Sequence, residues 1–254
     1  MPRIDLNADV GEGFGAWAMG ADAELLALVT SANVACGFHA GDPVVMDRTV
    51  ALAVRAEVAI GAHPSHPDLR GFGRRAIQAD PAEIERDVVY QVGALQAFAR
   101  AHGTRVVHVK PHGALYNQAA EDEAVARAIA RGVVRADAKL ILVGLASTAL
   151  MRRAAEAEGL RFAAEAFADR RYTPKGTLVS RREPGAVLSD PAQAAAQAVK
   201  IATEGRVLAS DGTEVELRAD TLCLHGDNPA AVANAAAVRR ALESAGVAVR
   251  SLDV

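Results

Sequence analysis

The chain has 254 residues, of which 51% are hydrophobic, and its formal net charge is −3. This length suits one large core, so we expect a single domain over residues 1–254. The basic residues are spread along the chain, which argues against nucleic-acid binding, and no apolar run is long enough to span a bilayer. Strand-like sequence starts at Arg3 and leaves no room for a secretory signal, so we expect a cytoplasmic protein with a small-molecule substrate.

The first predicted strand covers residues 4–10, where apolar residues alternate with Asp5, Asn7 and Asp9. This alternation places the three polar side chains on one face of the strand. Asp5 and Asn7 either form structural hydrogen bonds or belong to a functional site. Asp9 lies nearest the strand end, so we expect it to belong to a functional site. Glu12 follows in a glycine-rich turn that permits close approach to a ligand.

The next two predicted strands, residues 31–36 and 58–63, lead to histidines. His39 lies between two glycines with no structural duty visible in the sequence, so it is a candidate acid, base or ligand. His63 ends its strand and opens a loop over residues 64–75, a length typical of functional loops. Three arginines of this loop could clamp a carboxylate or phosphate: Arg70, Arg74 and Arg75.

The fourth predicted strand, residues 106–109, stops at Lys110-Pro111-His112. The proline ring cannot donate to a strand ladder, so the strand ends there. The carboxyl end of this strand is therefore followed by the ammonium group of Lys110, the imidazole of His112 and the phenol of Tyr116. Parallel sheets and β/α barrels place their active sites at that end.

Residues 139–144 and 161–167 read as the fifth and sixth strands. The fifth ends without a charged group. Glu165 lies within the apolar sixth strand, and a carboxylate there needs a partner or a raised pKa, either of which makes it a site candidate. Asp169 and Arg170 follow this strand and either pair with each other or join the site.

An Asp-Gly turn predicts a β-hairpin over residues 207–217, and residues 221–224 form a strand that leads to His225 and Asp227. A last short strand, residues 247–252, is expected to close the sheet. Helices are expected between the strands, at residues 21–30, 43–57, 81–102, 119–136, 147–158, 191–203 and 229–245. Seven or eight β/α units with one hairpin predict a TIM-like α/β barrel whose polar strand tips meet at one mouth.

Six segments in chain order carry a resemblance: D-L-N-A-D-V-G-E (5–12), A-C-G-F-H-A-G-D-P (35–43), G-A-H-P (61–64) with G-F-G-R-R (71–75), V-K-P-H-G-A-L-Y-N (109–117), F-A-D-R (167–170) and C-L-H-G-D (223–227). Together they resemble the LamB/YcsF family. The resemblance implies a barrel similar to those of the glycoside hydrolase and deacetylase superfamily. It also implies a 5-oxoprolinase reaction, the opening of 5-oxoproline (pyroglutamate) to L-glutamate, with ATP as co-substrate, Mg as its ion, and two partner subunits, B and C.

As a hypothesis, Asp9 or His39 activates water, and Lys110 and His112 stabilise charge on the transferring phosphoryl group or tetrahedral intermediate. Glu165 either protonates the leaving nitrogen or orients a base, and an arginine of the 70–75 loop holds the substrate carboxylate. The predicted substrate-binding residues are Asn7, Glu12, His63, Arg74, Tyr116, Asp169, Arg170, His225 and Asp227.

The sequence contains no G-x-x-x-x-G-K-[ST], and Lys175-Gly176-Thr177 lacks the context of a P-loop, so the location of ATP stays open. An alternative is a metal-dependent amidohydrolase or deacetylase acting alone, with Asp9, His39 and His63 as metal ligands. A third is a non-catalytic scaffold. Cys36 and Cys223 are expected to be buried, unpaired thiols.

Overall fold

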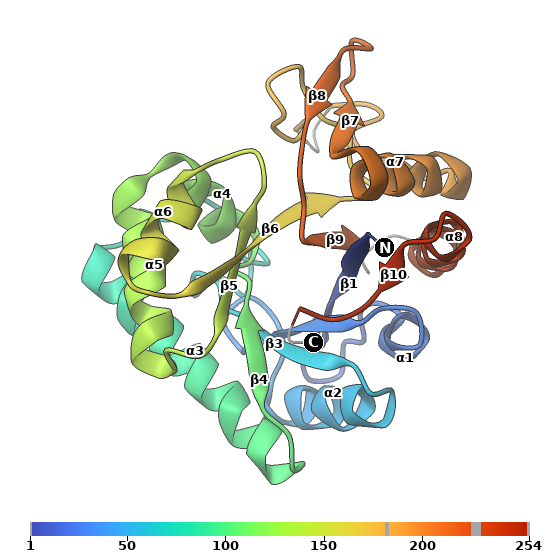
Figure 1. The fold of residues 1–254 in the computed structure, drawn as a ribbon. Coiled ribbons are helices and arrows are strands. Elements are labelled where there is room, and N and C mark those ends of the chain that lie inside the picture. Colours follow the sequence, from blue (N-terminus) through green and yellow to red (C-terminus); the bar gives the residue numbers. More distant parts are fainter. Residues whose placement is uncertain (1, 181–182, 225–229, 253–254) are drawn as a thin grey trace.

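The computed structural model describes residues 2–180, 183–224 and 230–252. A parallel barrel forms its centre, with helices around the outside (Figure 1). The barrel strands are β1 (Arg3–Val10), β2 (Ser31–Ala35), β3 (Ala59–His63), β4 (Val106–Val109), β5 (Ile141–Leu145), β6 (Arg161–Phe167) and β9 (Thr221–Leu224). Because β9 pairs with both β6 and β1, the seven strands close on themselves. The predicted α/β barrel is confirmed.

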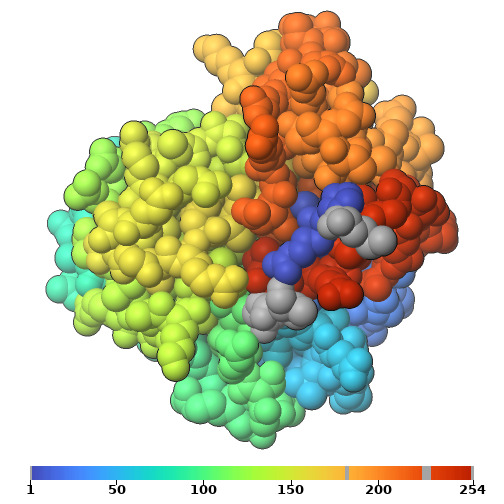
Figure 2. All heavy atoms as spheres, viewed as in Figure 1, coloured from blue at the N-terminus to red at the C-terminus, as the bar shows by residue number. Residues whose placement is uncertain are grey.

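The strand that closes the barrel differs from the prediction. The C-terminal strand β10 (Ala248–Val249) pairs only with Arg3 and Ile4, at the start of β1. From Asp5 onward, β9 occupies that side of β1, beginning with the pair Asp5 and Thr221. The expectation that the last strand closes the sheet was therefore wrong. The first residues and the C-terminal segment lie on one face of the molecule (Figure 2).

Eight helices lie among the described residues: α1 (Asp22–Leu26), α2 (Pro43–Arg55), α3 (Pro81–Ala101), α4 (Gly113–Glu121), α5 (Glu123–Ala136), α6 (Leu150–Ala157), α7 (Pro191–Glu204) and α8 (Ala231–Ser244). Three of these helices, α2, α3 and α7, are capped by Asp42, Asp80 and Asp190, whose carboxylates accept from backbone N–H groups of the first turn. None of these helices is long and apolar enough to cross a membrane.

Three helix predictions were wrong in detail. The helix expected over residues 119–136 is two helices, because Asp122 ends α4 and caps α5 by accepting from Ala124 and Val125. The first helix spans only five residues, Asp22–Leu26. The helix expected over residues 147–158 is α6, which begins only at Leu150. The predicted hairpin is present as β7 (Arg206–Leu208) and β8 (Glu214–Glu216), which project from the barrel (Figure 1).

The main apolar core lies between the barrel and its helices, whereas the inside of the barrel combines a small apolar cluster with polar side chains. Asp5 is fully enclosed and accepts hydrogen bonds from Thr30 and Ser31 at 2.7 Å and from Thr221 at 2.5 Å. Burial raises the pKa of Asp5 to about 6, although these hydroxyl donors act in the opposite direction. Asp5 is therefore a structural residue of the barrel floor, one of the two roles that the sequence left open.

Candidate active site

The carboxyl ends of the strands surround a cavity of about 730 Å³, a volume typical of small-molecule sites. Eight predicted site residues line it: Asp9, Glu12, His63, Arg74, Lys110, His112, Tyr116 and Arg170. Four others, Asn7, His39, Glu165 and Asp169, are buried and do not line it. His225 and Asp227 lie outside the described residues. The convergence of strand tips predicted from the sequence is present in the structure.

Lys110 occupies the centre of a buried group that we call the lysine cluster: Asn7, Asp9, Lys110, Tyr116, Glu165 and Cys223. The ammonium nitrogen of Lys110 lies 2.9 Å from Asp9 Oδ1 and 3.0 Å from Glu165 Oε1. Burial disfavours this charge, yet the carboxylates of Asp9 and Glu165 help to hold the Lys110 pKa well above its usual value. Lys110 is therefore a fixed cation beside the cavity, suited to stabilising negative charge.

Glu165 makes one ion pair and accepts two hydrogen bonds within the lysine cluster. Its Oε1 pairs with Lys110 and accepts from Asn7 Nδ2 at 3.1 Å, and its Oε2 accepts from the Tyr116 hydroxyl at 2.7 Å. Of the two roles considered for Glu165, this arrangement favours positioning its neighbours over protonating a leaving group.

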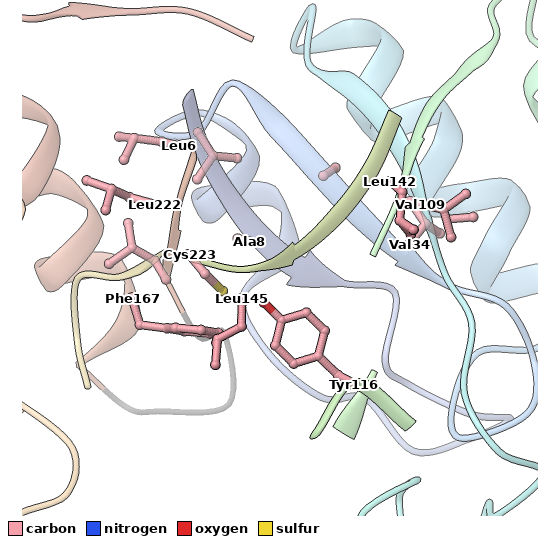
Figure 3. Packing of buried hydrophobic residues seen from close by; sticks show 14 of the residues in the cluster. Leu6, Ala8, Val34, Val109, Tyr116, Leu142, Leu145, Phe167, Leu222 and Cys223 are labelled. Carbon is pink, nitrogen blue, oxygen red and sulfur yellow. The ribbon is translucent and has the colours of Figure 1, made fainter. Parts of the chain in front are cut away.

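Tyr116 and Phe167 form the apolar edge of the lysine cluster. Their rings pack edge to face with 6.5 Å between centroids, at one end of the hydrophobic cluster that also includes Cys223 (Figure 3). Burial, together with the Glu165 carboxylate, holds the pKa of Tyr116 well above its ordinary value, so the phenol stays protonated as a donor.

Asp9 is the carboxylate of the lysine cluster that reaches the cavity, with 11% of its side chain exposed. Its Oδ1 accepts from Lys110 and from Asn33 Nδ2 at 2.9 Å. Its Oδ2 lies 3.4 Å from His63 Nε2 and faces a second group of side chains. An ionised carboxylate held in this way can accept a proton from water in the cavity.

We call that second group the histidine cluster: Glu12, His39, His63 and His112, all buried. His112 Nδ1 lies 2.9 Å from His63 Nε2 and 3.5 Å from Glu12 Oε1, and His39 Nε2 lies 3.3 Å from the same oxygen. Burial, reinforced by the neighbouring imidazole of His63, lowers the pKa of His112 to about 3. Burial likewise lowers the pKa of His39 well below its ordinary value, so both rings are neutral near pH 7.

The loop arginines separate into different roles. Arg75 pairs with the buried carboxylate of Asp68. Arg74 lines the cavity, with its guanidinium 5.1 Å from the centre of the Phe72 ring. Arg74 is therefore the loop arginine placed to meet an anionic ligand, while Arg75 holds the loop.

Sequence reasoning missed two polar residues of the barrel interior, Asn33 and His108. Asn33 donates to Asn7 Oδ1 at 2.7 Å and its own Oδ1 pairs with His108 Nε2 at 2.7 Å. Strand β2 alternates as β1 does, so the same period-two pattern that singled out Asn7 could have found Asn33. Both residues connect to the lysine cluster through Asn7 and Asp9.

The two cysteines are free and buried, as predicted. Burial raises the pKa of Cys36 to about 12 and that of Cys223 well above its ordinary value, although Lys110 acts in the opposite direction on Cys223. Neither thiol is a competent nucleophile at neutral pH, because the thiolate is the reactive form.

The chain is similar to known proteins over nearly its whole length. The sequence model of the LamB/YcsF family matches residues 4–254. A protein of Methylococcus capsulatus, named as the A subunit of 5-oxoprolinase, is 58% identical over 249 residues, which cover 98% of this chain and 95% of that protein. The solved structure of a lactam utilization protein from Thermus thermophilus is 50% identical, covers 98% of this chain and 100% of its own, and superposes with a TM-score of 0.94.

A more distant structure, T48 deacetylase with substrate, superposes with a TM-score of 0.51 at 14% identity, over 99% of this chain and 89% of that one. At that identity the likeness shows only a shared barrel fold. The family match over residues 4–254 and the relative at 58% identity show family membership as well as fold. The chain belongs to the LamB/YcsF family.

Proposed function

We propose that this chain carries the ring-opening site of a 5-oxoprolinase, which converts 5-oxoproline to L-glutamate with hydrolysis of ATP to ADP and phosphate, in a complex with two partner subunits, B and C. The observation that carries the proposal is the cavity lined by Lys110 and Asp9 in a chain whose relatives are named as the A subunit of 5-oxoprolinase. The need for ATP fits a cytoplasmic location.

A five-membered lactam is an unreactive amide, so its carbonyl carbon must become more electrophilic before water attacks. Transfer of the γ-phosphoryl group of ATP to the amide oxygen achieves this. Water then adds to the carbon, the carbon–nitrogen bond breaks with a proton going to nitrogen, and a second water hydrolyses the resulting acyl phosphate. Two waters and one ATP are consumed for each glutamate and phosphate released.

Within this scheme Asp9 is the general base, because it reaches the cavity as a carboxylate, whereas His39 is fully buried. Asp9 takes the proton of the attacking water and returns it to the leaving nitrogen. The ammonium group of Lys110 stabilises negative charge on the phosphoryl group and on the tetrahedral intermediate. Glu165 positions Lys110 through an ion pair and Tyr116 through a hydrogen bond.

Arg74 binds the substrate carboxylate, since it lines the cavity and its neighbour Arg75 is engaged by Asp68. His112 and Arg170 line the cavity on other sides and contact the substrate or the phosphoryl group. ATP enters as co-substrate with Mg. The chain carries no P-loop sequence. The phosphates of ATP therefore bind in the open part of the cavity or at the interface between this chain and a partner subunit.

The experiment is glutamate release from 5-oxoproline by this chain alone and mixed with its two partner subunits, each with and without ATP. The proposal expects release only in the complete mixture with ATP. The absence of glutamate release in every combination, with assembly of the subunits confirmed by size-exclusion chromatography, would contradict the proposal.

A second candidate is a metal-dependent amidohydrolase or deacetylase acting alone, and the histidine cluster favours it. It predicts hydrolysis by the isolated chain, without ATP, that a chelator removes and a divalent metal restores. The same assay therefore separates the two functions.

A further inference from the structure

The ring-opening scheme gives a role to His112 but does not explain why four such side chains gather in the histidine cluster. Glu12, His39, His63 and His112 come from the loops after three different strands and from the end of β3, and each offers one nitrogen or oxygen atom. These four atoms lie within 4.8 Å of one another. Glu12, His63 and His112 also line the cavity, so a small ion can reach them.

Backbone carbonyls determine which nitrogen of two rings carries hydrogen. His63 Nδ1 lies 2.7 Å from the carbonyl oxygen of Lys110, and His112 Nε2 lies 2.9 Å from that of Phe72. A carbonyl oxygen can only accept, so both nitrogens donate. In the neutral rings, the remaining nitrogens, His63 Nε2 and His112 Nδ1, carry lone pairs.

These two lone-pair nitrogens face each other at 2.9 Å. Two acceptors at that distance repel unless a positive charge lies between them. A bridging proton would serve this pair and Asp9 Oδ2, which lies 3.4 Å from His63 Nε2, but it would leave His39 and Glu12 unused. A metal ion would use both nitrogens together with Glu12 Oε1, which lies 3.5 Å from His112 Nδ1 and 3.3 Å from His39 Nε2.

Three separations within the cluster fit a four-coordinate metal, and the other ligand atoms lie at most 4.8 Å apart. Zinc–nitrogen and zinc–oxygen bonds of about 2.0–2.1 Å in a tetrahedron place ligand atoms about 3.3–3.4 Å apart. The observed separations of 2.9, 3.3 and 3.5 Å lie around this value. The hydrogen bonds from His63 and His112 to carbonyl oxygens are the outer-shell contacts that metal-binding imidazoles commonly make.

We propose that Glu12, His39, His63 and His112 bind one divalent transition-metal ion of the Zn²⁺ class. Three imidazoles and a carboxylate, without a thiolate, suit Zn²⁺, Co²⁺ or Mn²⁺. The rings of His39 and His112 stack at 3.8 Å with an interplanar angle of 5°, so His39 has to tilt to bring its lone pair to the ion. When bound, the ion supplies Lewis-acid chemistry at the cavity wall.

This metal site differs from the set Asp9, His39 and His63 considered from the sequence. Asp9 Oδ1 is held by Lys110 and Asn33, which assigns Asp9 to the lysine cluster. The inference goes beyond the proposed function and does not rest on it, because metal binding is measured on the chain alone without substrate, ATP or partners. A chain that binds metal in an inactive complex would contradict the proposed function only.

The test is titration of the chelator-stripped, full-length chain with Zn²⁺ against a chromophoric chelator, and with Co²⁺ followed by visible absorption. The expected result is one ion per chain, with the absorption bands of a four-coordinate Co²⁺ site. His63→Gln and His112→Gln should each weaken binding by about 100-fold or more. His102→Gln is the matched control. His102 lies at the end of α3, where it pairs with Asp47, and its substitution should leave metal binding unchanged.

Circular dichroism of each metal-free variant checks that it folds. Should either histidine variant fail to fold, Glu12→Gln carries the test, because it preserves side-chain size while removing a ligand charge, and it should weaken Zn²⁺ binding at least about 10-fold. Absence of stoichiometric binding by the wild-type chain would overturn the inference. So would tight binding that none of the folded variants changes.

Discussion

The ammonium nitrogen of Lys110 lies 3.0 Å from Glu165 Oε1 although Lys110 follows strand β4 and Glu165 belongs to β6, and both side chains are buried. Asp9, from a third strand, completes the arrangement at 2.9 Å. One cation thus balances two carboxylates at the mouth of the barrel. Removal of Lys110 leaves both carboxylates without their cation, which determines the expected effect of substitution there.

Lys110→Met should abolish glutamate release by the assembled complex and lower the free energy of unfolding by about 3–5 kcal/mol, because Asp9 and Glu165 lose their shared cation. The measurements are steady-state glutamate release and urea unfolding. Lys110→Met combined with Glu165→Gln is the control. It should recover part of the stability and none of the activity, whereas recovery of activity would refute the role of Lys110.

Arg74→Ala should raise the KM for 5-oxoproline by about 10- to 100-fold, the loss of one charge-assisted pair with the substrate carboxylate. Arg75→Ala is the matched variant, since Arg75 pairs with Asp68 instead of lining the cavity. It should raise KM much less than Arg74→Ala, because it removes a contact that holds the loop and not one with the substrate. Equal effects on KM from the two substitutions would show that Arg74 has no special contact with the substrate.

Asp5→Asn should change the pH dependence of stability. The Asp5 pKa rises from 3.8 to about 6 on folding, so its contribution to stability is present below pH 3.8 and is lost as the pH rises through about 6. Between pH 4 and pH 7.5, the wild type should lose about 2 kcal/mol relative to Asp5→Asn. Urea unfolding of both proteins at the two pH values measures this difference. A constant difference would mean that Asp5 does not titrate in this range.

Gly61→Ala should destabilise the barrel by about 1–3 kcal/mol, because a Cβ atom at Gly61 would collide with the imidazole of His108 on β4. Gly93→Ala in α3 is the control. No atom lies within 4 Å of a Cβ there, so that substitution should stabilise the protein by about 0.5–1 kcal/mol. Thermal unfolding of both variants tests the polar packing inside the barrel, and equal effects would argue against it.

Much of the fold could be predicted from the sequence because each strand is a short apolar run that ends in polar or glycine residues. The closing strand could not. Its assignment depends on whether β9 or β10 pairs with β1, and Thr221 and Asp5 are too far apart in the chain for local pattern to reveal their register. The division of α4 from α5 at Asp122 is a local capping signal that was available but overlooked.

The site residues could be named from the sequence, but their division into two clusters could not. The positions of Glu12 and His39 just after strands predict that both lie at the mouth of the barrel. They do not predict that Glu12 Oε1 lies 3.3 Å from His39 Nε2. That contact depends on the turn after β1, where Gly11 has a φ of 69° and the Gly13 carbonyl accepts from Gly41. Likewise, the burial of Glu165 was visible in its apolar strand, whereas its three partners required the closed barrel.

The central claim is that the strand-tip site of this chain opens the lactam ring, and Asp9 tests it most directly. The measurement is the rate of ATP-dependent glutamate release from 5-oxoproline by the complex with partner subunits, reconstituted with wild-type chain or with Asp9→Asn. We predict a loss of at least about 100-fold for Asp9→Asn, the contribution of a general base, with assembly and folding intact. A wild-type rate from the fully assembled Asp9→Asn complex would contradict the account.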